Sequence, residues 1–509
     1  MTEAAVEAGL RASDATVAWC LRHASRRERL GELEQAAIWA HVAARTAVKF
    51  GHSWLSSAPL ESILVRLGVR LPHVSGARAG GATSADRWLH VFSMSYEIGG
   101  HTAIARRWIA RNPFGQRHSV LLTTQSDAAI DPGLARAVLT SGGEIHSVAG
   151  IGSLLERAAA LRRLARDTAD VVVLHTHEED VVPSLAFAAP GGPPVLLINH
   201  ADHTFWVGLA VSDMIVDIRD SGLALSTSFR GARGSALLPV PLEDRGPAPR
   251  DRSVAAARMS DPSPLNRALV LLTVGRSHKF LPQPRLDFPA CGMRIVDALG
   301  DCALIVVGAV PEDPLWRRAA EQSGGRVIAV ETDPDLAPWH AAADIYLEGF
   351  PIGSYTALLE AALAARPFVR KPHLMSPSVL PVDRGALGAF EPPADMDAYV
   401  AAAIALAQRA DGRDARADEG RRAVLAFHCG PDWDARLDAL QRAIPADHGV
   451  GFGAERSPMP AELARYWARI RRAESGDDPL GYAQKSVLEH GLNWRIDVEL
   501  LEGMRARSG

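Results

Sequence analysis

Residues 343–371 read ADIYLEGFPIGSYTALLEAALAARPFVRK, and this stretch is the most informative part of the chain. A buried strand at Asp344–Leu347 runs into a loop with one acid, Glu348, and then into an apolar helix. A helix start offers unpaired backbone N–H groups and the positive end of the helix dipole, so it can cradle a phosphate. We expect such a cradle from one glycine and three hydroxyl residues, Gly353, Ser354, Tyr355 and Thr356.

Glu360 adds a second element to this predicted pocket. It follows Thr356 by four residues, about one turn further along the same helix face, where a carboxylate can accept hydrogen bonds from ribose hydroxyls. The alternative is structural, since Ser and Thr commonly cap helices without a ligand and Glu360 could be a solvated helix acid. The glycine, the hydroxyls and the spaced glutamate together favour a nucleotide-diphosphate pocket.

Composition narrows the class of protein. The 509 residues suffice for two or three domains, and the formal charge of −4 argues against nucleic acid as a partner. Four scattered cysteines without a C-x-x-C pair argue against a zinc site or disulfide framework and suit a reducing cytoplasm. The N-terminus carries acids where a secretory signal carries basic residues, and prolines break the apolar stretch Val181–Ile198. We therefore expect a cytoplasmic protein with no membrane span, whose oligomeric state the sequence leaves open.

The alternation of strands and helices predicts an α/β protein. Short apolar runs such as WLHVFSM, DVVVLHTH and ALVLLTVG alternate with helical stretches, which indicates parallel sheets covered by helices on both faces. Two linkers, the Gly/Ala/Ser-rich His73–Ser84 and the Pro-rich Pro241–Asn266, divide the chain. We expect a helical N-terminal module (1–80), a first Rossmann-like, acceptor-side domain (85–245), a second, nucleotide-sugar-binding one (265–445) and a helical C-terminal tail (446–509). Two such doubly wound domains would place a cleft between them.

A basic loop follows the first strand of the second domain. ALVLLTVG ends in Gly275, and Arg276, Ser277, His278 and Lys279 come next. Lysine is a compact charge suited to a leaving phosphate, and arginine can bind two oxygens at once. A solvated basic loop is the alternative, but the place of this loop at the carboxyl end of a parallel strand favours diphosphate binding.

Histidines follow strands of the first domain. Gly99 and Gly100 come after a strand, and His101 stands at the mouth of the next helix, as a catalytic base, an acceptor contact or a helix cap. Two further clusters follow later strands; their candidate bases are His200, His203 and Asp202, with His175 and His177 as outer candidates. Neither cluster has H-E-x-x-H spacing or a clear third ligand, so we expect no metal. Alternatively, Asn199 and Asp202 fix a turn and the histidines bond the backbone.

Two weaker motifs are set aside. The run Gly150-Ile151-Gly152-Ser153 resembles the front of a dinucleotide fingerprint, but Leu155 occupies the third glycine position, so a helix cap is the better interpretation. The patterns Asp333-Pro334-Asp335 and Asp395-Met396-Asp397 match a D-x-D metal motif that arises often by chance, and neither follows an apolar strand.

From roughly Arg87 to Ala443 the chain resembles glycosyltransferases of the GT-B fold, two facing Rossmann-like domains that use a nucleotide sugar without a required metal or other cofactor. LEGFPIGSYTALLEAALAARPFV is similar to the acid-x-x-Pro…Gly-x-x-Thr…acid pattern of the O-GlcNAc transferase family, which includes bacterial protein N-glucosyltransferases. The resemblance implies that Lys279 contacts the leaving phosphate and that His101 lies near the acceptor. It also assigns the diphosphate to Ser354, Tyr355 and Thr356, and the ribose to Glu360.

The predicted function is transfer of a hexosyl or N-acetylhexosaminyl group from a nucleotide sugar, UDP-linked by preference. The acceptor would be a protein side chain, a small molecule or a glycan. Retaining relatives usually show two glutamates eight positions apart, and here Ile352 occupies the earlier position, so we expect an inverting displacement. The alternatives are a sugar-nucleotide epimerase of the same fold and a non-catalytic partner subunit.

Overall fold

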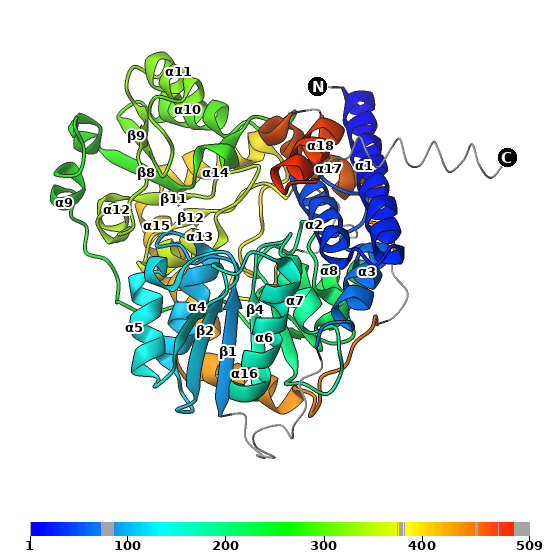
Figure 1. The fold of residues 1–509 in the computed structure, drawn as a ribbon. Coiled ribbons are helices and arrows are strands. Elements are labelled where there is room, and N and C mark those ends of the chain that lie inside the picture. Colours follow the sequence, from blue (N-terminus) through cyan, green and yellow to red (C-terminus); the bar gives the residue numbers. More distant parts are fainter. Residues whose placement is uncertain are drawn as a thin grey trace. The chain divides into compact units, whose positions relative to one another are not determined.

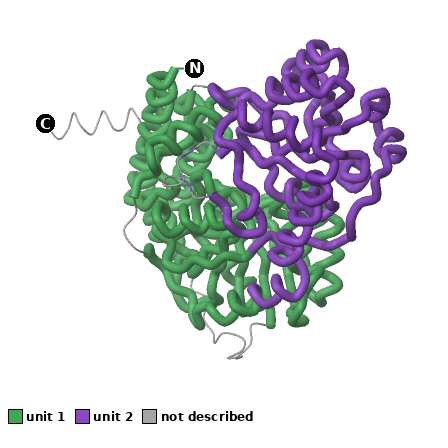
Figure 2. Tube along the Cα trace, turned by 180° about the vertical axis from the view of Figure 1, so that it is seen from behind, with its two compact units in different colours: residues 1–238, 437–509 green, residues 239–436 purple. Residues whose placement is uncertain are grey.

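The computed structural model describes residues 2–72, 86–373, 375, 380, 382–453, 457–476 and 478–492. The chain divides into two compact units, shown in different colours in Figure 2. Unit 1 comprises Met1–Leu238 and Leu437–Gly509, and unit 2 comprises Pro239–Arg436. The predicted linker His73–Ser84 lies outside the described residues.

Seven parallel strands form the sheet of unit 1, in the order β3-β2-β1-β4-β5-β6-β7. They are β1 (Arg87–Phe92), β2 (Arg117–Leu122), β3 (Ile145–Ser147), β4 (Val171–His175), β5 (Val195–Asn199), β6 (Met214–Asp217) and β7 (Ser235–Leu237). This is the doubly wound order 3-2-1-4-5-6 with one added strand, and the strand order reverses between β1 and β4. A ligand of such a sheet binds at the carboxyl ends of the strands that flank this point.

Helices cover both faces of this sheet (Figure 1). Leu89 and Val91 of β1 pack with α6 and α7, whereas Phe92 packs with α4 and α5. Because successive strand residues point to opposite faces, these contacts place the two helix pairs on opposite sides of the sheet. The helices of this part are α4 (Gly100–Arg111), α5 (Pro132–Thr140), α6 (Leu154–Thr168), α7 (Val181–Ala186) and α8 (Asp220–Leu225), with short turns η1 (Asp127–Ala129), η2 (Leu209–Val211) and η3 (Ser226–Arg230).

The predicted N-terminal helices are present and belong to unit 1. They are α1 (Glu3–Arg29), α2 (Leu33–Phe50) and α3 (Ala58–Gly68). The Glu34 carboxylate on α2 accepts hydrogen bonds from the backbone N–H groups of Leu154 and Leu155 at the start of α6, at 2.7 and 3.0 Å. Glu61 on α3 accepts three more from residues 208–210 at 2.7–3.1 Å. These charge-assisted bonds attach the helices to the sheet domain.

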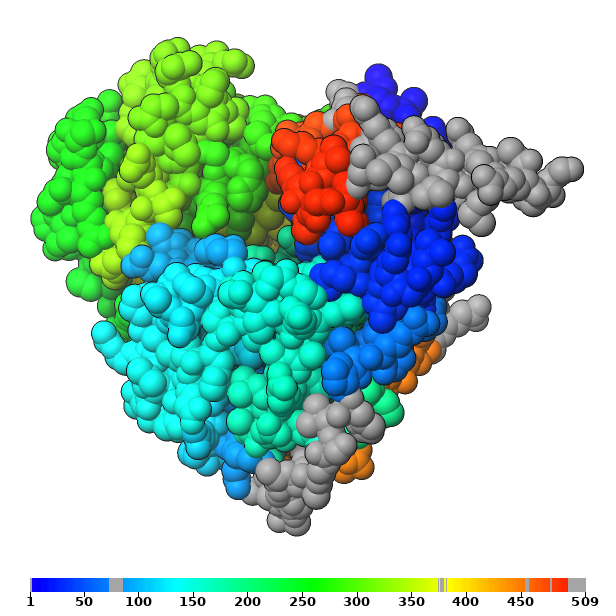
Figure 3. Space-filling model, in the orientation of Figure 1, coloured from blue at the N-terminus to red at the C-terminus, as the bar shows by residue number. Residues whose placement is uncertain are grey.

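The C-terminal helices complete unit 1. α17 (Ala461–Ser475) and α18 (Pro479–Glu489) pack against α1 and α2, and Figure 3 shows the red C-terminal helix beside the blue N-terminal ones. The ring of Tyr482 lies 5.4 Å from that of Phe50. The predicted helical tail therefore packs on the helical module. Within the described residues, no helix is both long and apolar enough to span a membrane.

Unit 2 contains a five-stranded parallel sheet in the order β10-β9-β8-β11-β12. Its strands are β8 (Leu269–Val274), β9 (Cys302–Val307), β10 (Val327–Val330), β11 (Ile345–Leu347) and β12 (Phe368–Val369). Its helices are α9 (Ser253–Ala256), α10 (Phe288–Leu299), α11 (Pro314–Gln322), α12 (Ala337–Ala342), α13 (Tyr355–Leu363), α14 (Met396–Gln408) and α15 (Ala410–His428), with turns η4 (Ser263–Asn266) and η5 (Ser277–Phe280). The strand order again reverses, between β8 and β11.

The unit boundary falls within α16 (Gly430–Ala443). The predicted Pro-rich linker lies in unit 2 and is held to its sheet, because Arg250 and Arg252 form ion pairs with Asp344 at 3.0 and 2.7 Å. The compact units thus group the predicted helical module, first α/β domain and tail together. The four predicted boundaries themselves stay predictions.

Candidate functional site

In unit 2, the loops after β8 and β11 bring Lys279 and Ser354 together. Lys279 Nζ donates a hydrogen bond to Ser354 Oγ over 3.2 Å. Ser354 is the N-cap residue of α13, yet among the described residues its side chain makes no capping hydrogen bond. The hydroxyl therefore faces the ammonium instead of closing the helix end. Both residues lie where the strand order reverses, the expected position of a ligand.

Burial lowers the pKa of Lys279 to about 8, and neighbouring Arg276 contributes to this shift. The ammonium is still charged at neutral pH, but burying this charge costs the folded protein free energy. An anion at this position would favour the charged form and offset that cost. The loop therefore suits a phosphate.

Close packing shapes the loop between β11 and α13. A Cβ atom at Gly353 would lie 2.6 Å from Glu348 Oε1, so only glycine fits there without movement. Glu348 is buried, and its Oε2 accepts a hydrogen bond from the Lys371 N–H at 2.9 Å. Tyr399 donates its hydroxyl to the Glu348 carbonyl at 3.0 Å. Glu348 thus fixes the loop that presents Ser354.

The other predicted contacts lie on α13 as the sequence places them. Tyr355, Thr356 and Glu360 are all half-buried. The Tyr355 ring lies 6.3 Å from that of His428. Burial lowers the pKa of His340 to about 4, and the nearby Glu360 carboxylate opposes this shift. The diphosphate and ribose roles of these residues stay predictions.

In unit 1, His101 lies at the start of α4, with Gly99 as the N-cap residue and Gly100 as the first helical residue. His101 Nε2 lies 3.1 Å from the Met94 carbonyl. A carbonyl only accepts, so Nε2 carries the proton and Nδ1 keeps its lone pair. Burial, and to a lesser extent His200, lower the pKa of His101 to about 4, so the ring is neutral.

His200, in the loop after β5, faces His101. The two rings stack with centroids 5.4 Å apart and planes inclined by 27°. The His200 Nδ1 bonds the Ile198 carbonyl at 3.3 Å, which leaves Nε2 as an acceptor. His177, after β4, lies 5.9 Å from His101 between ring centroids. The structure therefore brings three of the predicted histidines together.

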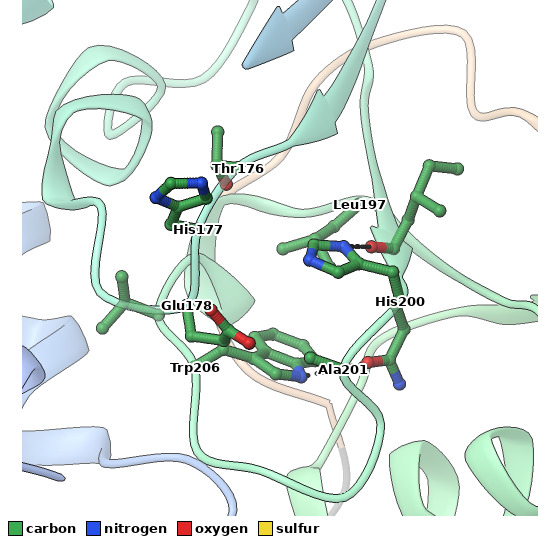
Figure 4. A pocket seen from close by; sticks show the side chains of 10 residues that line it. Thr176, His177, Glu178, Leu197, His200, Ala201 and Trp206 are labelled. Carbon is green, nitrogen blue, oxygen red and sulfur yellow. Dashed lines mark hydrogen bonds between the residues drawn. The ribbon is translucent and has the colours of Figure 1, made fainter. Parts of the chain in front are cut away.

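Glu178 belongs to the same cluster, although the sequence analysis did not select it. Figure 4 shows Glu178 and His200 lining one small cavity of about 10 Å³, enough for one water molecule. Burial opposes ionisation of Glu178, but His200 and other neighbours outweigh it and lower the pKa of the carboxyl. In turn, the carboxylate opposes the lowering of the His200 pKa by burial. The signal in the sequence was its place directly behind β4, beside His177.

Asp202 and His203 are bonded differently. The Asp202 carboxylate accepts hydrogen bonds from Arg219 Nε and Nη2 at 2.6 and 2.7 Å, and from His203 Nδ1 at 2.9 Å. Burial opposes ionisation, but Arg219 outweighs it and holds the pKa of Asp202 far below its usual range. The His203 ring stacks on Trp467 at 4.0 Å. These contacts favour a role in holding the loop, while the acceptor-side role of Asp202 and the catalytic role of His203 stay predictions.

The motifs that the sequence analysis set aside have structural partners. Ser153 accepts the Glu156 N–H as the N-cap of α6, so the predicted helix cap is confirmed. Asp333 and Asp335 both bind Arg258. Within the described residues, no three His, Cys, Asp or Glu side chains lie close enough to hold a metal ion.

No protein-family model and no curated protein matches the chain. Solved structures do. HepE (Alr3699) of Anabaena, in complex with UDP and glucose, has a TM-score of 0.53 at 15% identity, covering 70% of this chain and 100% of that chain. TarM of S. aureus, in complex with fondaparinux, alpha-GlcNAc-glycerol and UDP, has a TM-score of 0.50 at 7% identity, with coverage of 70% and 100%.

The fold is that of GT-B glycosyltransferases. The predicted fold class is thereby confirmed, as two Rossmann-like units with helical N- and C-terminal additions. At such low identity the likeness establishes the fold alone. An O-GlcNAc transferase of Thermobaculum terrenum aligns with a TM-score of 0.47 at 15% identity, covering 85% of this chain and 82% of that chain, too low to add to the argument.

Proposed function

We propose that this protein transfers a sugar from a nucleotide-sugar donor to an acceptor, with inversion at the anomeric carbon. The observation that carries the proposal is the Lys279–Ser354 contact of 3.2 Å where the strand order of unit 2 reverses. A cation, a hydroxyl and a helix start meet there, which are the groups that recognise a diphosphate. The GT-B fold supports this use of the site.

The reaction assigns separate tasks to the two units. The bond between the anomeric carbon and the diphosphate oxygen breaks, and Lys279, Arg276 and the start of α13 stabilise the charge on the departing diphosphate. An acceptor oxygen or nitrogen forms the new bond to the anomeric carbon and loses its proton to a base. That base comes from unit 1.

His200 and His101 are the candidate bases. Each neutral ring has one nitrogen bonded to a backbone carbonyl and the other left as an acceptor. Glu178 favours His200, because a carboxylate beside an imidazole stabilises the cation that forms when the ring takes up a proton. We therefore assign proton uptake to His200 with Glu178 as its partner, and acceptor contact to His101.

The donor is proposed to be UDP-linked, with hexose or N-acetylhexosamine as the sugar. HepE, which shares the fold, was solved with UDP and with UDP-glucose. The acceptor is proposed to be a protein side chain, a small molecule or a glycan. The N-terminal helices are proposed to help select it, since residues of α1, of the loop before α3 and of the start of α3 line a cavity of about 500 Å³.

A nucleotide panel tests the donor half. Thermal unfolding of the protein is followed with UDP, GDP, TDP and their sugar derivatives, and UDP species are expected to raise the midpoint. Ser354→Ala should weaken this stabilisation, whereas Ser263→Ala, at an exposed serine of the same unit, should not. Stabilisation by none of the nucleotides would refute the proposal. Mass spectrometry of co-expressed proteins and added glycans, after incubation with the stabilising sugar nucleotide, then identifies the acceptor.

A further inference from the structure

Three neighbouring strands of unit 1 each carry a buried histidine on the same face of the sheet. His118 lies on β2, His90 on β1 and His175 at the end of β4, and none is more than 1% exposed. His118 is paired in register with Trp88, and His175 with Phe92, so the three histidines lie on a diagonal across the sheet. They alternate with residues packed on α6 and α7, and therefore face α4 and α5.

Hydrogen bonds join these rings into a chain. His175 Nε2 lies 3.0 Å from His90 Nδ1, and His90 Nε2 lies 3.0 Å from His118 Nδ1. At the far end, His118 Nε2 lies 3.3 Å from Asn112 Oδ1. Each link needs one donor and one acceptor, so the protonation of one ring fixes that of the next.

Asn112 sets the donor-to-acceptor direction of all the hydrogen bonds in this row of histidines. Its Oδ1 accepts the Gln116 N–H and its Nδ2 donates to the Gln116 carbonyl, both at 2.8 Å, so the amide cannot be turned over. Because Oδ1 only accepts, His118 must donate from Nε2 and accept at Nδ1. His90 and His175 then repeat this arrangement. His175 Nδ1 is left as an unprotonated lone pair.

The opposite direction is excluded by the same geometry. It would set the His118 Nε2 lone pair against Asn112 Oδ1, and it would place a buried N–H on His175 Nδ1. That atom has no hydrogen-bond partner within the described residues. A buried donor without a partner is more costly than an acceptor lone pair in the same place.

The hydrogen-bonded histidines carry no charge themselves and act through their aligned dipoles. Burial lowers the pKa of His118 to about 4, and it lowers the pKa values of His90 and His175 well below their usual range. All three rings are therefore neutral at pH 7, and their dipoles point the same way along the hydrogen bonds. Such bonds polarise one another.

The negative end of this row of histidines, His175 Nδ1, lies at the candidate active site. The chain runs from β2 through β1 to β4, and the next strand in the sheet is β5, which leads into His200. His175 directly precedes the loop of His177 and Glu178. The Phe92 ring stacks on His175 at 4.7 Å and lies 6.1 Å from His101.

We propose that Asn112, His118, His90 and His175 are positioning residues, whose aligned imidazole dipoles stabilise the cation that forms when His200 takes up a proton. The inference rests on the proposed function for its catalytic effect. Besides His175, the titratable groups that face His200 among the described residues are Glu178 and His177 from the loop after β4, His101 from α4 and Asp202 from its own loop. The row of histidines adds to the effect of Glu178.

Nuclear magnetic resonance of the ¹⁵N-histidine-labelled full chain tests the alignment without any substrate. We expect His118, His90 and His175 each to appear as a neutral ring protonated at Nε2. Asn112→Gly removes the anchor but keeps the backbone, since Asn112 has a φ of 33° that glycine adopts freely. This variant should show a second tautomer at His175, and Asn112→Asp, which keeps an acceptor oxygen, should restore the first.

Kinetics test the catalytic effect. With the UDP-sugar that stabilises the protein, Asn112→Gly should lower kcat about tenfold, the lower end of the effect of removing an outer partner that orients a metal-bound histidine. KM for the sugar nucleotide should stay the same, and the acidic limb of the kcat profile should move to lower pH. Asn112→Asp should recover both. A proton on His175 Nδ1 in the wild type, or unchanged tautomers and kcat in Asn112→Gly, would overturn the inference. If no UDP-sugar is turned over, the proposed function fails, and the tautomer measurement still decides whether the chain is aligned.

Discussion

Replacing Lys279 with methionine should make the protein more stable and, at the same time, unable to bind a diphosphate. Burial lowers the pKa of Lys279 from 10.5 to about 8. One pKa unit corresponds to about 1.4 kcal/mol, so holding the ammonium in this loop costs the folded protein about 3 kcal/mol at pH 7. Methionine removes this cost and also loses the hydrogen bond to Ser354, worth about 1 kcal/mol. The net gain for Lys279→Met is about 2 kcal/mol.

The gain should depend on pH in one direction. Because the folded-state pKa of Lys279 lies below that of the unfolded chain, the unfolded chain holds an extra proton between pH 8 and 10.5. The free energy of unfolding of the wild type therefore rises across this window, whereas the Lys279→Met variant lacks this contribution. The stability gain should be full below pH 8, fall to about zero near pH 10 and reverse by up to about 1 kcal/mol above pH 10.5, where only the lost hydrogen bond to Ser354 remains.

Urea denaturation at pH 7 and pH 10 measures both effects, and the shift of the thermal midpoint on adding UDP measures binding. Lys485→Met is the control, because that side chain is 78% exposed and its loss should change neither quantity. The reasoning fails if Lys279→Met is less stable than the wild type at pH 7, or if its stability advantage is the same at pH 10. If Lys279→Met keeps the UDP-induced thermal shift, Lys279 does not bind the diphosphate.

Two further predictions concern unit 1. Glu61→Gln should lower the free energy of unfolding by about 3 kcal/mol, because an amide cannot accept from all three backbone N–H groups of residues 208–210. Thermal unfolding measures this, with the exposed Glu489→Gln as the control. Equal unfolding midpoints for the two variants would contradict the prediction. His200→Asn should reduce sugar transfer by about a hundredfold or more while leaving the UDP-induced thermal shift intact. His146→Asn on β3 is the control. Near-normal turnover by the His200→Asn variant would exclude His200 as the base.

The sequence was sufficient for the parts of the fold that repeat locally. Apolar β-branched runs alternating with helices predicted both parallel sheets, and parallel topology brings the carboxyl ends of the strands to one edge. This is why the sequence alone assigns Lys279 and Ser354, 75 positions apart, to one site. The same rule placed His101 and His200 at the edge of the first sheet.

Long-range ties could not be predicted in this way. Glu61 reaches backbone groups 147 positions further along the chain, and no periodicity or motif marks such a contact. For the same reason the sequence does not show the contacts by which the helical module joins unit 1. The histidine chain was hidden as well, because His90 and His118 sit within apolar strands and only the register of the sheet places them on a diagonal.

Ser354 shows what the structure adds where the sequence leaves two interpretations open. Both interpretations of the sequence, helix cap and ligand contact, require the same residue at the same position, so no further reading of the sequence could separate them. The partner of the hydroxyl argues against the cap, whereas the ligand contact stays a prediction. In a cap, Oγ accepts from the second or third N–H of its own helix, whereas here it accepts from Lys279 Nζ. A hydroxyl held by a buried, charged lysine at a helix start is consistent with the proposed diphosphate contact, and the nucleotide panel with Ser354→Ala tests that role.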